Sequence, residues 1–238
     1  MATRTHRSQR RTQALSRERI VEAAVELLGA AGESGLTFRT LSEHLATGPG
    51  AIYWHVANKD ELLGAATDAV VAAALAVEPA LPADATPRDR IHAVALGLFD
   101  AIDRHPWIAG QLTATTFQST TPRIFESIGR QIRDLGVPRS GWFTATSALV
   151  EYILGAAGQN AANGRVLGPG ADRTAYLDSV SRAWEDLDPD DFPFTRAVAD
   201  QLREHDDREQ FLAGIDLLLA GVTARHLPGD PAATPPAP

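Results

Sequence analysis

A cluster of large amphipathic side chains near position 54 is the feature of this sequence best suited to contact another molecule. Tyr53, Trp54 and His55 are consecutive, and Lys59, the only lysine beside twenty-one arginines, follows four residues later. The segment that carries the aromatic residues is too short to bury all of them. We therefore expect these side chains to be displayed at the surface, where a partner can reach them.

Motifs of the common enzyme classes do not occur in the sequence. There is no G-x-S-x-G, no Gly-Lys-Ser/Thr phosphate-binding loop and no H-E-x-x-H. The acidic run from Asp186 to Asp191 resembles the opening of a calcium loop, but it lacks the glycine at its sixth position and has Ala197 where a glutamate is needed. With zero cysteines there is also no thiolate metal site and no disulfide. We expect no enzymatic activity, no cofactor and no metal.

Two short helices must position the aromatic cluster. Leu41 and Leu45 are four residues apart and therefore share one helical face. The Ala-Thr-Gly-Pro-Gly run that follows interrupts the pattern, and Pro49 suits the first position of a new helix. That second helix, predicted from Pro49 to Val56, turns Ile52 and Val56 inward. Two short helices joined by a tight turn, the second displaying aromatic and polar groups, are typical of a helix-turn-helix DNA reader.

The helices on either side of this pair are predicted from their caps. Ser16 is a favourable N-cap for a first helix with an apolar stripe, and Gly32 and Gly35 are expected to end it. Asn58, with Glu61 three residues later, has the pattern of a capping box at the start of the helix that follows the pair. The first helix is expected to pack behind the pair and complete a three-helix unit.

This stretch resembles the DNA-binding domain of the TetR family of repressors. The matching residues are Leu36, Thr37, Arg39, Leu41 and Leu45, then residues 52–56 and 58–63. The run Tyr-Trp-His-Val followed by Asn-Lys is much more specific than a general helix-turn-helix pattern. The resemblance implies an all-α protein that binds double-stranded DNA as a homodimer.

The resemblance also implies roles for individual residues. Arg39 is expected to reach a base edge, most naturally guanine, and Trp54 to pack on a sugar or a base edge. Tyr53, His55 and Lys59 are expected to contact phosphates. The complete set expected at DNA is Thr37, Arg39, Gly50, Ala51, Tyr53, Trp54, His55 and Lys59. For Tyr53 and Trp54 the alternative is a half-buried aromatic clamp between helices.

The turn between the two helices departs from the usual pattern of the family. Ala46 and Thr47 stand where glycine followed by an apolar residue is common, and residues 48–51 offer no long polar side chain. Base readout is therefore expected to rest on fewer side chains, with Ala51 against a thymine methyl group and a contribution from groove shape. Two copies related by two-fold symmetry are expected to read a palindrome whose half-sites lie about one helical turn apart or slightly more.

The net charge of −8 hides an asymmetry along the chain. Residues 1–60 contain eight Lys or Arg and six Asp or Glu, a balance of +2, whereas residues 61–238 contain fourteen and twenty-four, a balance of −10. Five arginines precede the first acidic residue, Glu18. The pattern indicates a basic end that faces DNA and an acidic body held away from phosphate, although a solvated basic tail without a partner gives the same pattern.

Helical periodicity extends over most of the chain, and no apolar run of 18 residues that could cross a membrane occurs in it. We expect four parts: a basic flexible arm at 1–15, a helix-turn-helix domain at 16–62, a helical regulatory and dimerisation domain at 63–226, and a disordered proline-rich tail at 227–238. Beyond residue 87 the pattern predicts helices at 88–104, 107–114, 122–135, 139–162, 174–184, 194–205 and 209–226. The N-terminus has no apolar segment after its basic residues, so we expect a cytoplasmic protein.

The body of the chain resembles the regulatory domain of the same family more weakly. The resemblance assigns residues 148–155 and 210–219 to two helices that pair with their copies across a two-fold axis. The residues expected at this dimer interface are Leu149, Ile153, Gly155, Ala156, Ile215, Leu218, Leu219 and Val222. Small residues permit the close helix approach that such a bundle needs, but both helices could instead be the core of a monomer.

The body is also expected to hold a small molecule between its central helices. The residues expected to line that pocket are Phe99, Trp107, Phe117, Gln118, Phe125, Trp142, Tyr152, Gln159 and Asn160. Aromatic walls with a few polar groups suit a flat or lipophilic ligand. For any single aromatic residue in this set, a place in the core is the alternative.

These expectations together predict a ligand-responsive, homodimeric transcriptional repressor that leaves a palindromic operator when a small molecule binds its body. An architectural DNA-binding protein without an inducer is the first alternative, and it would show weak sequence preference. An activator could use the same dimer. A small-molecule enzyme or carrier with a vestigial reader is the third alternative, and it would not bind DNA at low salt.

Overall fold

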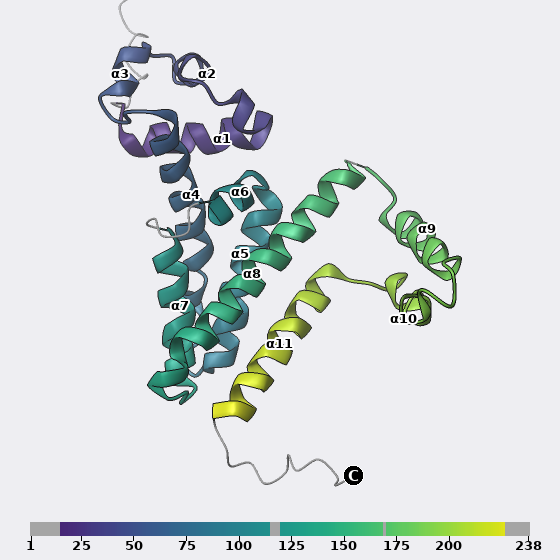
Figure 1. Cartoon of the computed structure of the whole chain (residues 1–238). Coiled ribbons are helices and arrows are strands. Elements are labelled where there is room, and N and C mark those ends of the chain that lie inside the picture. The colour runs from purple at the N-terminus through teal and green to yellow at the C-terminus, as the bar shows by residue number, and fades with distance from the viewer. Residues whose placement is uncertain (1–14, 115–119, 169, 227–238) are drawn as a thin grey trace, which may run out of the picture. The chain divides into compact units, whose positions relative to one another are not determined.

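The computed structural model describes residues 15–114, 120–168 and 170–226, and within these ranges it contains helices, turns and loops but no strand. The predicted all-α fold is confirmed. Two compact units meet between Val70 and Val71, and the helix α4 (Lys59–Leu75) contributes to both of them (Figure 1). The N-terminal unit and the C-terminal unit are described separately below.

The N-terminal unit is a three-helix arrangement followed by the start of α4. Its elements are α1 (Arg17–Gly35), α2 (Phe38–His44) and α3 (Pro49–Tyr53). Ser16 caps α1 as predicted, because its side chain accepts a hydrogen bond from the Arg19 backbone N–H at 3.3 Å. The helix α1 reaches Gly35 across a kink at Gly32, whose φ of 64° and ψ of −170° are not helical.

Reciprocal capping fixes the start of α2. The Thr37 N–H donates to Thr40 Oγ1, and the Thr40 N–H donates to Thr37 Oγ1, each at 3.0 Å. The hydroxyl of Thr40 also donates to the Gly35 carbonyl at 2.9 Å, which ties the end of α1 to the beginning of α2. The second helix of the pair is shorter than predicted, since α3 ends at Tyr53 and Trp54 occupies its C-cap.

The start of α4 is held by hydrogen bonds at its first turn. Asn58 Oδ1 accepts the Glu61 N–H at 2.8 Å, as the capping-box pattern requires. The carboxylate of Glu61 accepts the N–H of Ala57, one residue before the position expected, and also binds Arg17 at 2.9 Å. These two contacts, first the backbone N–H and then Arg17, hold the pKa of Glu61 below its usual value.

The C-terminal unit is a helical bundle built around one long helix. After α4 its elements are η1 (Glu78–Ala80), α5 (Pro87–Arg104), α6 (Trp107–Ala114), α7 (Thr120–Asp134), α8 (Arg139–Leu167), α9 (Arg173–Glu185), α10 (Pro193–Ala197), η2 (Asp200–Leu202) and α11 (Asp207–His226). Figure 1 shows α8 crossing this unit from one end to the other, in contact with α5, α7 and α11. The buried ridge of Leu149, Ile153 and Ala157 on α8 forms the centre of the core.

Two helix boundaries in this unit differ from the prediction. The helix α8 continues to Leu167, whereas the sequence predicted an end near residue 162 because glycine and asparagine follow. The predicted helix at 194–205 is only the five-residue α10 followed by the short turn η2. Polar contacts replace helical continuity there, since Ser181 Oγ donates to the Ala199 carbonyl at 2.5 Å and Arg203 binds Asp178 and Glu185.

Candidate nucleic-acid interface and ligand cavities

The short helix α3 buries one face and displays another. Ile52 is fully buried and Val56, just beyond α3, is 1% exposed, so these residues anchor the segment in the core of the N-terminal unit. Between them Tyr53 is 54% exposed and Trp54 is 88% exposed. Both aromatic side chains are therefore exposed, as the sequence predicted. Tyr53 and Trp54 are adjacent in the sequence, so the two rings form a small exposed aromatic patch at the end of α3.

Tyr53 also has a structural role. Its ring stacks on the ring of Phe38 with centroids 4.4 Å apart and an interplanar angle of 7°. The stack joins the first turn of α2 to the end of α3, so it fixes the relative position of the two helices of the pair. The clamp that was the alternative for Tyr53 thus exists, and its half-exposed ring edge still faces solvent.

The two cationic residues expected at DNA already have partners inside the N-terminal unit. Arg39 Nε binds Glu43 Oε1 at 3.0 Å, and the Arg39 side chain is 87% exposed. Lys59 Nζ donates to the Glu33 carbonyl at 2.6 Å. An exposed pair one helical turn apart contributes only about 0.3–0.5 kcal/mol. The pair with Glu43 therefore holds the Arg39 guanidinium only weakly, and the ammonium of Lys59 keeps two further donors.

The turn between α2 and α3 contains a strained residue. Ala46 has a φ of 51°, the only positive φ at a non-glycine position among the described residues. The Thr47 N–H closes the turn by donating to the Ser42 carbonyl at 3.0 Å. The left-handed conformation explains why glycine suits this position, since an alanine Cβ costs about 1–2 kcal/mol there.

The remaining residues expected at DNA lie at the start of α2, on α3 and just after α3. Thr37 and Gly50 are exposed, and Ala51 and His55 are half-buried. All eight residues of the expected set belong to the N-terminal unit.

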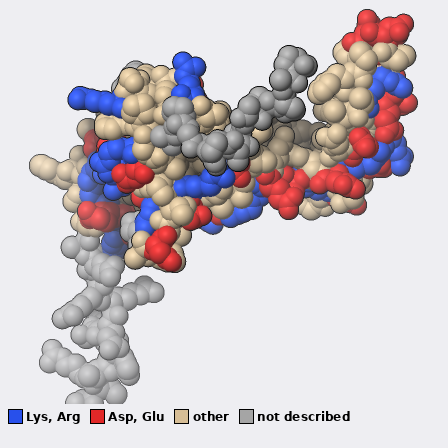
Figure 2. Space-filling model, turned by 90° about the horizontal axis from the view of Figure 1, so that it is seen from below, with Lys and Arg blue, Asp and Glu red and all other residues tan. Residues whose placement is uncertain are grey.

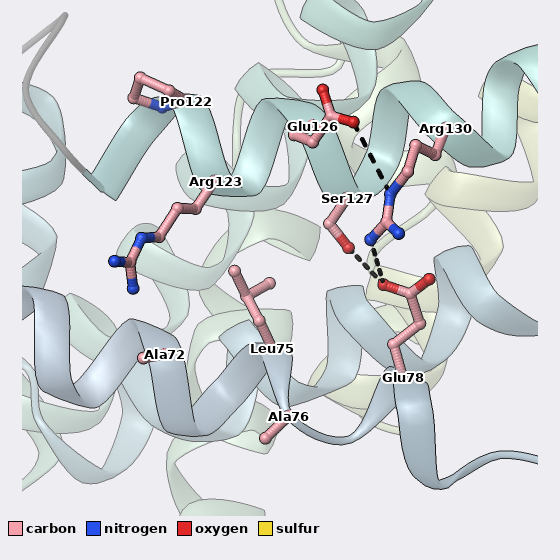
Figure 3. Close-up of a pocket in the computed structure, with 9 residues that line it drawn as sticks. All are labelled: Ala72, Leu75, Ala76, Glu78, Pro122, Arg123, Glu126, Ser127 and Arg130. Atoms are coloured by element: carbon pink, nitrogen blue, oxygen red, sulfur yellow. Dashed lines mark hydrogen bonds and ion pairs between the residues drawn. The ribbon is translucent and has the colours of Figure 1, made fainter.

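A first cavity lies in the C-terminal unit between the end of α4 and α7. It has a volume of about 620 Å³ and is lined by Ala72, Leu75, Ala76, Glu78, Pro122, Arg123, Glu126, Ser127 and Arg130. We call it the α4–α7 cavity. Figure 3 shows Leu75 pointing from α4 toward α7, with Arg123 toward one end and Arg130 beside Glu78 at the other. None of these nine residues belongs to the set that the sequence predicted.

A buried carboxylate closes one end of the α4–α7 cavity. Glu78 is 7% exposed and accepts hydrogen bonds from Ser127 Oγ at 2.6 Å and Gln131 Nε2 at 2.8 Å. Arg130 lies 3.6 Å from the same carboxylate. Two hydrogen bonds and one ion pair from α7 thus hold Glu78, the first residue of η1, which satisfies the requirement that a buried charge be paired and hydrogen-bonded. No local sequence pattern indicates this cluster, because Glu78 is about 50 residues from its partners on α7 and each member is an ordinary surface residue type.

A second cavity lies between α7 and the first turns of α8. It has a volume of about 370 Å³ and is lined by Phe125, Glu126, Gly129, Arg130, Arg133, Arg139, Trp142, Phe143 and Thr146. We call it the aromatic groove. Two residues of the predicted ligand set, Phe125 and Trp142, meet here.

The other residues of the predicted ligand set are separated in the structure. Phe99 and Tyr152 both pack on Phe211, with centroid distances of 4.8 Å and 5.9 Å, and so belong to the core beneath α11. Trp107 is buried and its Nε1 has no hydrogen-bond partner among the described residues. Gln159 is exposed and donates to Asn163, and Asn160 is half-buried. Phe117 and Gln118 lie outside the described residues. The described residues of this set therefore do not line one common pocket.

The residues expected at a dimer interface differ in their exposure. Leu149, Ile153, Ile215 and Leu219 are at most 1% exposed within one chain, so they pack in its core. Gly155 is exposed, and Ala156, Leu218 and Val222 are half-buried. The large apolar side chain that α11 leaves open is Leu217, which is 76% exposed and was missed. Leu217 is two residues from both Ile215 and Leu219, so it lies on the opposite face of the helix. This spacing is visible in the sequence and could have indicated its exposure.

Charged side chains are mixed over the lower face of the molecule. Figure 2 shows the structure of Figure 1 from below, and in this view Arg and acidic side chains are interspersed among uncharged ones. Red and blue side chains both occur at the right of Figure 2, where α9 and α10 lie, and the loop between these helices contains the exposed residues Asp186, Asp188, Asp190 and Asp191. Within the described residues none of the helices is long and apolar enough to cross a membrane.

Comparison with known proteins gives a consistent result for both units. A model of bacterial regulatory proteins of the tetR family matches residues 20–66. A model of tetracyclin repressor-like C-terminal domains matches residues 78–226. The two matches together include the helix-turn-helix pair and nearly all of the C-terminal bundle.

Solved structures and a curated relative agree with these models. The transcriptional regulator SCO7222, a TetR from Streptomyces coelicolor, is 63% identical, with 89% of this chain and 99% of that chain covered and a TM-score of 0.80. BioQ, solved with its natural double-stranded DNA operator, is 28% identical, with 88% of this chain and 99% of that chain covered and a TM-score of 0.55. An HTH-type transcriptional regulator of Saccharopolyspora erythraea is 33% identical over 146 residues, and the match covers 59% of each protein.

Proposed function

We propose that this chain is a homodimeric repressor of a palindromic operator. The chain belongs to the tetR family of bacterial regulatory proteins. Members of this family regulate transcription by binding DNA and are not enzymes. A small molecule that binds the C-terminal unit releases the repressor from DNA. The ligand acts by population shift, since it favours a dimer in which the two readers are wrongly spaced for successive major grooves.

The observation that best supports this function is the display of Tyr53 and Trp54 on a short helix whose opposite side is anchored by Ile52. An exposed aromatic pair at the end of the second helix of a helix-turn-helix pair is placed to meet sugar and phosphate while the helix enters the major groove. BioQ, which shares this fold, binds a double-stranded operator.

Each residue of the reader has a proposed contact. Arg39 leaves Glu43 and reaches a base edge, and Lys59 binds a phosphate near the start of α4. Tyr53 and His55 contact phosphates, and Trp54 packs on the wall of the groove. Thr37, Gly50 and Ala51 complete the interface, with Ala51 against a thymine methyl group.

The α4–α7 cavity is the proposed effector site. Its volume of about 620 Å³ is within the range of small-molecule pockets. One of its walls is the last turn of α4, and the same helix begins at Lys59, a proposed phosphate contact. A ligand that displaces the end of α4 or the Glu78 cluster therefore acts on the helix that also carries a DNA contact.

The dimer is proposed to form through the solvent-facing sides of α8 and α11. Leu217 supplies the apolar centre, and Leu218, Val222, Gly155 and Ala156 border it. Small residues on both helices allow the close approach that a bundle of two α8 and two α11 helices requires.

Salt dependence of DNA binding tests the reader. Lys59→Ala should weaken binding about equally on every duplex and lower the slope of log K against log salt by about one, because one phosphate contact is lost. The slope is measured by fluorescence anisotropy at several salt concentrations. Arg165→Ala, a change at an exposed arginine on α8, is the matched control and should leave the slope as it is. An unchanged slope in Lys59→Ala, with its fold intact by circular dichroism, would remove Lys59 from the interface.

A further inference from the structure

The aromatic groove has a composition that fits one class of small molecule. We propose that it binds a small aromatic carboxylate, with the ring against Phe125, Trp142 and Phe143 and the carboxylate on the arginines at its rim. The groove shares Glu126 and Arg130 with the α4–α7 cavity, but all the aromatic lining belongs to the groove. Binding to it can be measured without DNA, so the proposal goes beyond the proposed function.

The groove is built by the facing sides of two helices. On α8 the lining residues Arg139, Trp142, Phe143 and Thr146 follow the spacing of one helical face. On α7 the opposite wall has a glycine at its centre. A Cβ added at Gly129 would be 3.5 Å from Thr146 Oγ1, so the glycine lies against α8 and leaves a recess on either side of the contact.

The apolar part of the groove is aromatic. The rings of Phe125 and Phe143 are 5.7 Å apart at an angle of 44°, an arrangement in which a third ring can pack edge-to-face or offset. Phe143 is 74% exposed, so part of its ring has no protein neighbour. Trp142 donates its Nε1–H to the Val137 carbonyl at 2.6 Å. The indole is therefore oriented, its polar group is satisfied, and it offers a ligand only its ring.

The charged part of the groove favours an anion. Three arginines and one glutamate line it. Arg130 lies 3.9 Å from Glu126, and Arg133 binds Asp134 at 2.9 Å. Arg139 has no ion pair or side-chain hydrogen bond within the part of the chain that the structure describes. Its planar guanidinium can bind a carboxylate through two parallel hydrogen bonds.

The size of the groove limits the ligand to one or two rings. A volume of about 370 Å³ is near the lower end of the range for ligand pockets. The α4–α7 cavity differs in chemistry, since its apolar lining is Ala72, Leu75, Ala76 and Pro122 and contains no ring. Aromatic carboxylates should therefore prefer the aromatic groove to the larger cavity.

Three probes separate the contributions of ring and charge. Benzoate has both, benzyl alcohol has only the ring, and hexanoate has only the charge on an apolar chain. Isothermal titration calorimetry of the full chain should give benzoate a dissociation constant on the order of 1 mM, as expected for so small a ligand. Benzyl alcohol and hexanoate should each bind about tenfold more weakly, because each lacks one of the two interactions.

Two substitutions assign the binding to the groove. Arg139→Gln should weaken benzoate about tenfold and leave benzyl alcohol unchanged, whereas Phe143→Ala should weaken both aromatic probes. Both side chains are exposed, so the fold should tolerate either change. The matched controls are Arg165→Gln and Phe194→Ala; Phe194 is 76% exposed and lies on α10.

Three results would overturn the proposal. The first is equal affinity for benzoate and benzyl alcohol, and the second is the same loss in Arg165→Gln as in Arg139→Gln. The third is unchanged benzoate binding in Phe143→Ala together with a change in its sedimentation, which would assign this face to contact between two copies of the chain.

Discussion

Ala46 holds a backbone conformation that an alanine rarely adopts. Its φ of 51° is at the turn between α2 and α3, so its strain acts on the angle between the two helices of the reader. Ala46→Gly should raise the free energy of unfolding of the N-terminal unit by about 0.5 kcal/mol, because relief of the left-handed strain exceeds the extra entropy of glycine in the unfolded chain. Ala46→Val should lower it by about 1–2 kcal/mol, since a β-branched residue is more strained there.

Urea unfolding followed by circular dichroism measures both variants. The matched control is Ala30→Gly on an exposed position of α1, where the backbone is helical and the same substitution should cost about 1 kcal/mol. A loss of stability in Ala46→Gly equal to that in Ala30→Gly would show that Ala46 is not strained.

His105 is a half-buried histidine that should make the fold sensitive to acid. Burial, and to a smaller extent the charge of Arg104, lowers the pKa of His105 below its ordinary value near 6.5. The unfolded chain therefore takes up the proton first as pH falls, so stability present above about pH 6.5 is lost below it. Urea midpoints at about pH 7.5 and 5.5 should fall less for His105→Gln than for the unsubstituted chain. Parallel losses in the two proteins would contradict this assignment.

Surface exposure in the aromatic run was predictable from the sequence, because α3 is too short to bury three large side chains. The run from Tyr53 to His55 was expected at the surface, and Tyr53 and Trp54 are exposed there. The hydrogen bond from Lys59 to the Glu33 carbonyl could not be predicted, because it depends on where the kink at Gly32 directs the end of α1.

Contact between α8 and α11 depends on one close approach. A Cβ at Gly214 would overlap the phenol of Tyr152, whose hydroxyl donates to the Phe211 carbonyl at 3.2 Å. Gly214→Ala should therefore lower the free energy of unfolding of the C-terminal unit by about 1–3 kcal/mol through overpacking. Adding Tyr152→Leu should recover part of that loss, because the two changes share one contact.

Thermal or urea unfolding of these variants tests the contact. Gly164→Ala on α8 is the matched control, since a Cβ there meets nothing within 4 Å. It should be neutral or slightly stabilising in a helix. Equal effects of Gly214→Ala and Gly164→Ala would mean that Tyr152 moves away at no cost.

Helix starts were predictable and some helix ends were not. Ser16 and Thr37 are caps because their hydroxyls can bind backbone N–H groups, a property of the local sequence. The early end of α10 has a non-local cause, whereas the extension of α8 to Leu167 has no structural explanation. Arg196 on α10 donates hydrogen bonds to the carbonyls of Glu185 and Leu187, at and just beyond the end of α9. No local sequence pattern indicates that contact.

The ligand cavities show the same limit at the level of elements. Phe125 and Trp142 were correctly placed near each other, but Phe99 and Tyr152 serve the packing of α11. An aromatic residue on an apolar stripe does not indicate by itself whether its neighbour will be a helix or a cavity. The Glu78 cluster was missed because a buried carboxylate is recognised only by the donors that surround it.

At the scale of the whole molecule, the proposed dimer depends on Leu217. Leu217→Glu should convert the dimer to a monomer with poor operator affinity, because the substitution buries an unpaired charge at the centre of the interface. Sedimentation velocity measures the change. Phe194→Glu is the matched control, since Phe194 and Leu217 are each 76% exposed and only Leu217 lies on α11. A dimer that survives Leu217→Glu would place the interface on another face.

The measurement that tests the central claim most directly is selection of bound fragments from sheared genomic DNA by the purified protein, at about 150 mM salt to suppress non-specific binding. We expect recovery of fragments that share a palindrome with half-sites about one helical turn apart or slightly more, and a lower yield of the same fragments with Lys59→Ala, because a lost phosphate contact weakens binding to every duplex alike. Recovery of fragments with no common sequence, or of the same fragments by Lys59→Ala with equal yield, would contradict it.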